Sequence, residues 1–224
     1  MFDRIVPRYD LMNRVMTGGR DGAWRRLAVR EALRGRKVPA ARVLDVATGT
    51  GDIAIALRDA GVKTVVGLDF SEAMLREAAR KDGFASGVPV TWVEGDAMAL
   101  PFADASFDAV TVGFGLRNMP SYPGALREMG RVLAPGGVLV CLESTPVTAP
   151  VLRWAFAWYF SRIVPLVGGL LSGDPDAYAY LPASAAAFPD AESLGGMMLG
   201  AGFTRVRYLL LGMGTVALHV ATRD

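Results

Sequence analysis

The stretch Asp45-Val-Ala-Thr-Gly-Thr-Gly-Asp52 decides the fold expected for this chain of 224 residues. A short aliphatic segment, Val43–Ala47, leads into it, and a helix is expected to open at about Ile53. Gly49 and Gly51 carry no Cβ, so the backbone can turn sharply there and approach a ligand closely. A strand, a glycine-rich turn and a helix in this order are typical of nucleotide-binding α/β proteins.

Outward from this loop, short apolar runs alternate with helical patterns, which indicates a mostly parallel sheet with crossover helices. The further parallel strands are expected at Thr64–Asp69, Val90–Glu94, Phe107–Val112 and Val138–Glu143. Helices are expected at Asp21–Arg34, at Glu72–Lys81 behind the N-cap Ser71, before Pro135-Gly136-Gly137, and after Asp190. Most of the strands are rich in Val or Leu, as buried parallel strands are.

The chain is expected to end in an antiparallel hairpin. Its strands are Arg205–Leu211 and Thr215–Thr222, and the short glycine-rich link between them is too short for a helical crossover. Residues 144–189 fit no strand–helix unit, so we interpret them as a helical insertion on the substrate side, before the last helix. Residues 1–38 are interpreted as an N-terminal helical lid. The prediction for 1–224 is therefore a single α/β domain with a Rossmann-like, seven-stranded, mostly parallel sheet.

Composition excludes several classes of partner. The 24 basic and 22 acidic residues are interspersed and leave a net charge of +2, so no nucleic acid is expected to bind. A single cysteine, Cys141, rules out a disulfide framework and a multi-cysteine metal site, and it favours a cytoplasmic location. The apolar stretch 154–171 is interrupted by Arg162 and Pro165, so a transmembrane helix is not expected there.

The glycine loop alone leaves two cofactor classes open. Gly49-x-Gly51-x-x-Ala54 also satisfies the dinucleotide fingerprint, and Asp69 could accept hydrogen bonds from the ribose of either cofactor. Asp45 and Asp52 would repel a pyrophosphate but tolerate a ligand that carries a sulfonium and an ammonium. Gly95-Asp96-Ala97 follows the third strand, where a side-chain acceptor can bind the exocyclic amine of adenine. This pattern favours S-adenosyl-L-methionine over a nicotinamide dinucleotide.

The sequence resembles the ubiquinone/menaquinone-biosynthesis C-methyltransferase family of the class I S-adenosylmethionine-dependent methyltransferases. Its most specific segments are Tyr9-Asp-Leu-Met-Asn13, Leu44–Asp52, Phe114-Gly-Leu-Arg-Asn118 and Val216-Ala-Leu-His219. The resemblance covers almost the whole chain. It implies methyl transfer from S-adenosyl-L-methionine to a ring carbon of a prenylated quinol, with S-adenosyl-L-homocysteine as product. The acceptor is then demethylmenaquinol or its ubiquinone-pathway equivalent.

The resemblance also implies cofactor contacts. They fall on Thr50, Asp69, Asp96, Ala97 and Gly113, and the loop adds Asp45, Gly49, Gly51 and, after the second strand, Phe70. The family often has Ser at the position of Gly113, so only backbone contact is expected there. Three alternatives stay open: a class I methyltransferase acting on another hydrophobic phenol or small metabolite, an NAD(P) oxidoreductase, and a binding module without activity.

Arg117 is the residue expected to activate the acceptor. A guanidinium beside a ring hydroxyl lowers the pKa of that hydroxyl, but Arg stays protonated and is not itself the base. A water held between Arg117 and a carboxylate or Tyr9 would take the proton, and Asn118 would hold a ring oxygen. His219, the only histidine, is a second candidate base, with a structural role as the alternative.

The acceptor's prenyl tail suggests two roles for the apolar stretch 151–171. It could line a groove for the tail, or simply pack as helical core; peripheral contact with the inner face of a membrane is a related expectation. A mean hydropathy of +0.30 agrees with either a large core or an apolar surface. Monomer and homodimer both remain open.

Overall fold

The computed structural model describes residues 14, 17–83, 88–146 and 187–224. Tyr9, most of the expected insertion 144–189 and the first part of the expected lid 1–38 therefore lie outside the described residues. Within the described part, the helices are too short or too polar to span a bilayer.

The strands form one seven-stranded sheet in the order β3-β2-β1-β4-β5-β7-β6. All neighbours are parallel except β7, which runs antiparallel to both β5 and β6. Both the mostly parallel sheet and the closing hairpin are thus confirmed. The bounds are β1 Arg42–Val46, β2 Thr64–Asp69, β3 Thr91–Glu94, β4 Phe107–Gly113, β5 Leu133–Ser144, β6 Arg205–Leu211 and β7 Val216–Thr222.

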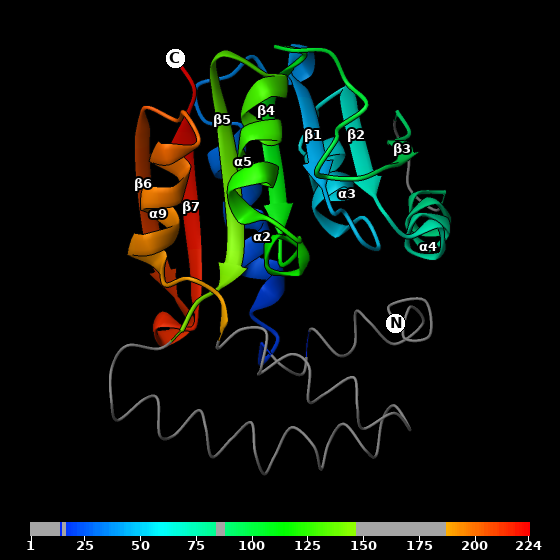
Figure 1. The fold of residues 1–224 in the computed structure, drawn as a ribbon. Helices are drawn as coiled ribbons and strands as arrows, with labels where there is room; N and C mark the ends of the chain where they lie inside the picture. The colour runs from blue at the N-terminus through cyan, green and yellow to red at the C-terminus, as the bar shows by residue number, and fades with distance from the viewer. Residues whose placement is uncertain (1–13, 15–16, 84–87, 147–186) are drawn as a thin grey trace.

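Helices cover both faces of this sheet (Figure 1). One buried cluster joins α5 and α9 to one face, and the other joins α2 and α3 to the opposite face. The helix bounds are α2 Asp21–Ala32, α3 Asp52–Asp59, α4 Glu72–Asp82, α5 Tyr122–Val132 and α9 Ala191–Gly200. The expected caps are present: Ser71 accepts a hydrogen bond from the amide of Met74, and Asp190 accepts one from the amide of Ser193.

Strand β5 begins earlier than the sequence pattern predicts. The expected start at Val138 is wrong, because Leu133 already pairs with Phe107 before a register shift. Gly136, with φ of +75°, makes this irregularity possible, and its amide donates to the carbonyl of Arg223. The prediction took Pro135-Gly-Gly as the stop of the preceding helix; that helix does end before it, and the segment itself is an irregular part of the strand.

Gly51 shows why the cofactor loop needs glycine. Its φ is +83°, and a Cβ on it would lie 2.6 Å from the ring of Trp92. Gly67 in β2 makes room for the same ring, since a Cβ there would lie 2.5 Å from it. Trp92 thus packs under the loop through space that two glycines leave open, and this packing holds the loop on the sheet.

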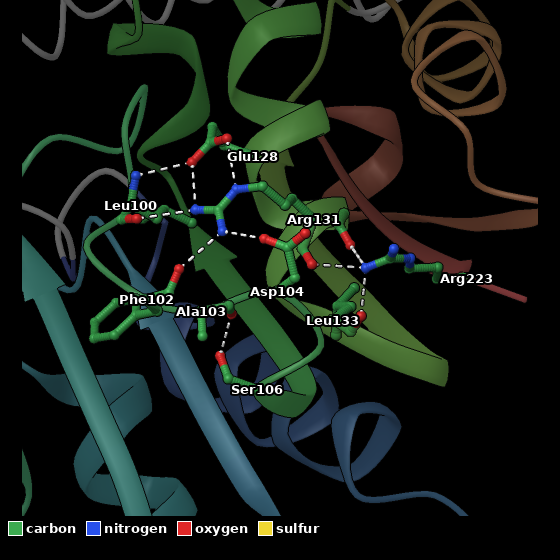
Figure 2. Close-up of polar contacts among 10 residues, drawn as sticks. Leu100, Phe102, Ala103, Asp104, Ser106, Glu128, Arg131, Leu133 and Arg223 are labelled. Carbon is green, nitrogen blue, oxygen red and sulfur yellow. Dashed lines mark hydrogen bonds and ion pairs between the residues drawn. The ribbon is translucent and has the colours of Figure 1, made fainter.

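A second group of contacts fixes the segment that follows β3 (Figure 2). Arg131 in α5 donates to the carbonyls of Leu100 and Phe102 at 2.9 and 2.8 Å. Its guanidinium also binds Glu128, which in turn accepts a hydrogen bond from the amide of Leu100. Arg223 donates to the carbonyl of Arg131 at 2.7 Å. The segment that carries Asp96 and Ala97 is therefore tied to α5 through Arg131, and Arg223 near the end of the chain binds α5 in turn.

Candidate active site

A pocket opens where β1 and β4 end, at the carboxyl edge of the sheet. Ligands of open α/β sheets bind at this edge. The pocket is lined by Arg25, Asp45, Ala47, Thr48, Gly49, Thr50, Asp52, Ile53, Gly113 and Phe114. Four of these, Asp45, Gly49, Thr50 and Gly113, are residues that the sequence assigned to cofactor binding.

Asp45 is a buried carboxylate at the base of this pocket, only 1% exposed. The hydroxyls of Thr48 and Thr111 each donate to it at 2.6 Å. Burial raises the pKa of Asp45 to about 6, and the two hydroxyl groups oppose part of that shift. The carboxylate is thus ionised at neutral pH, and a cation beside it would stabilise that charge.

Asp69 ties the loop to the end of β2. Its carboxylate accepts hydrogen bonds from the amides of Gly49 at 2.7 Å and Ser71 at 2.9 Å. Burial raises the pKa of Asp69, and these amide hydrogen bonds oppose the shift. The next side chain, Phe70, is 82% exposed, so its ring is accessible beside the site.

The segment after β3 continues the same edge. The carboxylate of Asp96 accepts a hydrogen bond from the amide of Met98 at 2.8 Å, which closes a turn. Ala97 packs against the buried cluster under α5. The carbonyl of Asp69 accepts from the amide of Gly95 at 3.0 Å, so the ends of β2 and β3 are joined here.

Asp52 at the start of α3 has two cationic partners that the sequence did not reveal. Arg25, from α2, and Lys81, from α4, both form ion pairs with it. Lys81 also donates to the hydroxyl of Thr50 at 3.2 Å. The charge of Asp52 is thereby largely compensated, so the argument that it repels a pyrophosphate is weaker than the sequence suggested. Of these two acids, Asp45 is therefore the one whose charge would repel a pyrophosphate.

Arg117 lies in the short 3₁₀ turn Leu116–Asn118, which follows β4. Its guanidinium forms an ion pair with Glu143 at the end of β5, and both side chains are buried, at 9% and 1% exposure. Glu143 also accepts hydrogen bonds from the amide of Arg117 at 3.3 Å and from the amide of Ser144 at 2.8 Å. The carboxylate expected near Arg117 is therefore present as Glu143.

The sequence also contains a signal for Glu143. The apolar strand expected at Val138–Glu143 ends in an acidic residue, as β2 ends in Asp69, and parallel strands end at one edge of the sheet. Asn118, in the same 3₁₀ turn as Arg117, is exposed.

His219 lies away from this pocket, inside the sheet. It is fully buried on β7, and its Nε2 is 2.8 Å from the carbonyl oxygen of Ala191 at the start of α9. The centroid of the Tyr208 ring lies 5.3 Å from that of the imidazole. Burial lowers the pKa of His219. This position agrees with the structural alternative; the role of His219 as a base stays a prediction that its surroundings do not support.

The sequence profile described as the ubiE/COQ5 methyltransferase family matches residues 1–223. The chain belongs to the ubiE/COQ5 methyltransferase family. Its similarity to individual ubiE/COQ5 relatives extends over their full or nearly full length. The demethylmenaquinone methyltransferase of Thermus thermophilus is 51% identical over 224 residues, 100% of both chains. That of Deinococcus radiodurans is 47% identical over 100% of this chain and 91% of the relative.

The name of a third relative refers to the biosynthesis of both ubiquinone and menaquinone. This relative is the ubiquinone/menaquinone biosynthesis C-methyltransferase UbiE of Desulfotalea psychrophila, 44% identical over 98% of this chain and 87% of the relative. The family resemblance seen in the sequence is thus confirmed, and the protein is a methyltransferase.

Solved structures agree on the fold. A SAM-dependent methyltransferase from Thermotoga maritima superposes with a TM-score of 0.64 at 22% identity, over 100% of this chain and 98% of the other. Magnesium protoporphyrin IX methyltransferase from Synechocystis, solved with bound SAH, gives 0.64 at 19% identity, over 91% and 84%. The ubiE/COQ5 protein therefore has the class I methyltransferase fold, as predicted.

Proposed function

We propose that this protein transfers the methyl group of S-adenosyl-L-methionine to a ring carbon of a prenylated quinol, converting demethylmenaquinol into menaquinol. The names of the relatives from Thermus thermophilus and Deinococcus radiodurans support this acceptor. The benzoquinol of the ubiquinone pathway is the close variant, supported by the UbiE relative.

One observation in the structure carries the proposal. Phe114 lines the cofactor pocket, and its ring centroid is 5.9 Å from the guanidinium carbon of Arg117. The pocket for the methyl donor and the cation for the acceptor are therefore neighbours on the loop that follows β4. Methyl transfer requires donor and acceptor to be aligned in this way.

The residues of the pocket fit the proposed cofactor. Asp45 offers a buried negative charge to the ammonium and sulfonium, and Asp69 stands where the ribose hydroxyls are expected. Phe70, Asp96 and Ala97 would surround the adenine, while Gly113 would offer only backbone. When bound, S-adenosyl-L-methionine supplies a methyl group that is already activated on sulfur.

On the acceptor side, the protein's work is positioning and charge stabilisation. Arg117 would lie beside a ring hydroxyl and lower the pKa of that hydroxyl, so that the ring becomes a better nucleophile. Glu143 holds the guanidinium in place from the end of β5. We assign Asn118 to a ring oxygen. A water held between Arg117 and a carboxylate or Tyr9 would take the proton.

Incubation with methyl-labelled S-adenosyl-L-methionine and chemically reduced demethylmenaquinone tests this function. Mass analysis should find one labelled methyl group on the naphthoquinone ring. A matched reaction with the oxidised quinone should give no label, because only the quinol ring is nucleophilic. Transfer to a different phenol but none to the quinol would overturn the acceptor. Stabilisation by NAD but not by S-adenosyl-L-homocysteine, measured by thermal unfolding, would overturn the cofactor.

Cofactor affinity should depend on pH through Asp45. Its carboxyl is ionised above about pH 6 and neutral below it, so affinity for S-adenosyl-L-homocysteine should fall as the pH drops below this value, by up to about tenfold per pH unit. Calorimetric titrations between pH 5 and 8 measure the effect.

The variant Asp45→Asn should bind more weakly and lose this pH dependence. Asp69 and Asp52 face the same region, and the comparison between the wild type and the variant isolates Asp45 from both. Asp224→Asn is a matched control, since that side chain is 63% exposed and pairs only with the exposed Arg205 among the described residues. An unchanged pH profile in Asp45→Asn would show that Asp45 does not contact the cofactor.

The lipophilic acceptor supports a location at the inner face of a membrane. A prenyl tail partitions into the bilayer, so we propose a cytoplasmic protein that reaches its substrate by peripheral contact. Sedimentation with anionic vesicles that contain demethylmenaquinone tests this location; recovery of all protein in the supernatant would contradict it.

A further inference from the structure

Arg25 is a cation in the wall of the cofactor pocket that the assigned contacts leave out. It lies in the second turn of α2, far in sequence from the glycine loop, yet it lines the pocket beside that loop. Its side chain is 15% exposed. Among the lining residues, Arg25 is the single cation, next to the two acids Asp45 and Asp52.

Two carboxylates hold the guanidinium of Arg25 in place. Asp21, one helical turn earlier, lies 3.2 Å from its Nη1, and Asp52 pairs with the same nitrogen. Asp21 is itself buried and accepts a hydrogen bond from the hydroxyl of Thr17 at 3.1 Å. The guanidinium is therefore fixed before any ligand arrives, which reduces the entropy lost on binding.

The remaining donors of Arg25 are suited to a carboxylate. Both ion pairs use Nη1, and Nε and Nη2 have no acceptor among the residues that the structure describes. These two nitrogens form one edge of the guanidinium, whose parallel N–H groups match the two oxygens of a carboxylate.

The charges of the cofactor fit this arrangement. Its amino-acid end carries an ammonium and a carboxylate, whose charges have opposite sign. The ammonium suits Asp45, whereas the carboxylate would be repelled by Asp45 unless a cation stands close to it. Arg25 is the lining residue that can supply that cation.

We propose that Arg25 binds the carboxylate of the cofactor's amino-acid end. The inference rests on the proposed function only in that the cofactor is S-adenosyl-L-methionine. The proposal makes α2 a part of the binding site. This helix is joined to the end of the glycine loop by the ion pair between Arg25 and Asp52.

Calorimetry with two ligands tests the assignment without any turnover. S-adenosyl-L-homocysteine has the carboxylate, and its decarboxylated analogue, 5′-(3-aminopropylthio)adenosine, lacks it. The wild type should bind the first about 10–100-fold more tightly, as expected for a charge-assisted bidentate contact. Arg25→Ala should bind both with nearly equal affinity, close to that of the wild type for the analogue.

Two controls accompany this comparison. Arg26→Ala removes an exposed arginine of the same helix and should behave as the wild type. Arg25→Lys keeps the charge but loses the paired N–H groups, so it should discriminate between the ligands less than the wild type and more than Arg25→Ala.

The possible outcomes separate the inference from the function on which it rests. If Arg25→Ala weakens both ligands by the same factor, Arg25 only supports the fold of the pocket, and the inference is wrong. If Arg25→Ala binds both ligands as tightly as the wild type does, another group binds the carboxylate, and the inference is again wrong. If the wild type binds neither ligand, the cofactor assignment itself fails, whatever Arg25 does.

Discussion

Replacing Arg117 with alanine should lower kcat for quinol methylation by about 10²–10⁴-fold, the range usual for loss of a group that assists ionisation. The dissociation constant of S-adenosyl-L-homocysteine should stay nearly unchanged. The reason is the position of Arg117: it lies on the acceptor side of Phe114, and its guanidinium pairs with Glu143 at the end of β5. Single-turnover rates and calorimetry measure the two quantities separately.

The same substitution should also destabilise the protein, and this effect has to be separated from the chemical one. Glu143 is only 1% exposed, and without Arg117 its carboxylate is buried without a cation, which costs about 3–5 kcal/mol. The double variant with Arg117→Gln and Glu143→Gln removes both charges together. It should recover most of the stability and none of the activity.

Two further variants sharpen this prediction. Arg127→Ala removes an exposed arginine of α5 and should leave both kcat and stability unchanged. Glu143→Gln keeps the shape of the side chain but not its charge. It should reduce kcat less than Arg117→Ala does, because Glu143 acts by positioning the guanidinium. An equal fall of kcat and cofactor affinity in Arg117→Ala would place Arg117 in the cofactor half of the site.

The second large effect concerns stability. Arg58→Ala should lower the free energy of unfolding by about 3–5 kcal/mol, because it leaves the carboxylate of Asp82 buried without its cation. The two side chains are 4% and 5% exposed, and they join α3 to α4. Asp82 also accepts a hydrogen bond from the amide of Val90 at 3.0 Å, so its charge cannot simply move into solvent.

Thermal unfolding provides the measurement. For a chain of this size the expected loss corresponds to a fall in Tm of roughly 6–20 °C. Arg76→Ala is the matched control: its pair with Glu72 is 71% and 65% exposed, and pairs of this kind contribute less than about 1 kcal/mol. Similar small losses in both variants would show that the Arg58 pair contributes no more than a surface pair.

Most of the fold could be read from local patterns. The short apolar strands, the Ser71 and Asp190 caps and the short glycine-rich link before β7 each depend on residues close together in the chain, so a sequence window contains the whole signal. The start of β5 could not be read in this way. It depends on Leu133 meeting Phe107 on a neighbouring strand, a contact between distant segments.

The candidate site, too, has features that adjacent residues determine and others that depend on contacts between distant segments. By itself, the sequence determined the glycine loop with its acids, the Phe-Gly-Leu-Arg-Asn motif at 114–118 and the family, because backbone turns and local motifs are properties of adjacent residues. Only the tertiary structure decided the partners: Glu143 for Arg117, and Arg25 and Lys81 for Asp52. Each of these pairs joins residues more than twenty positions apart. The positions of the strand and helix ends in space decide which charged side chains form ion pairs. A periodic pattern along the chain contains no information on those positions.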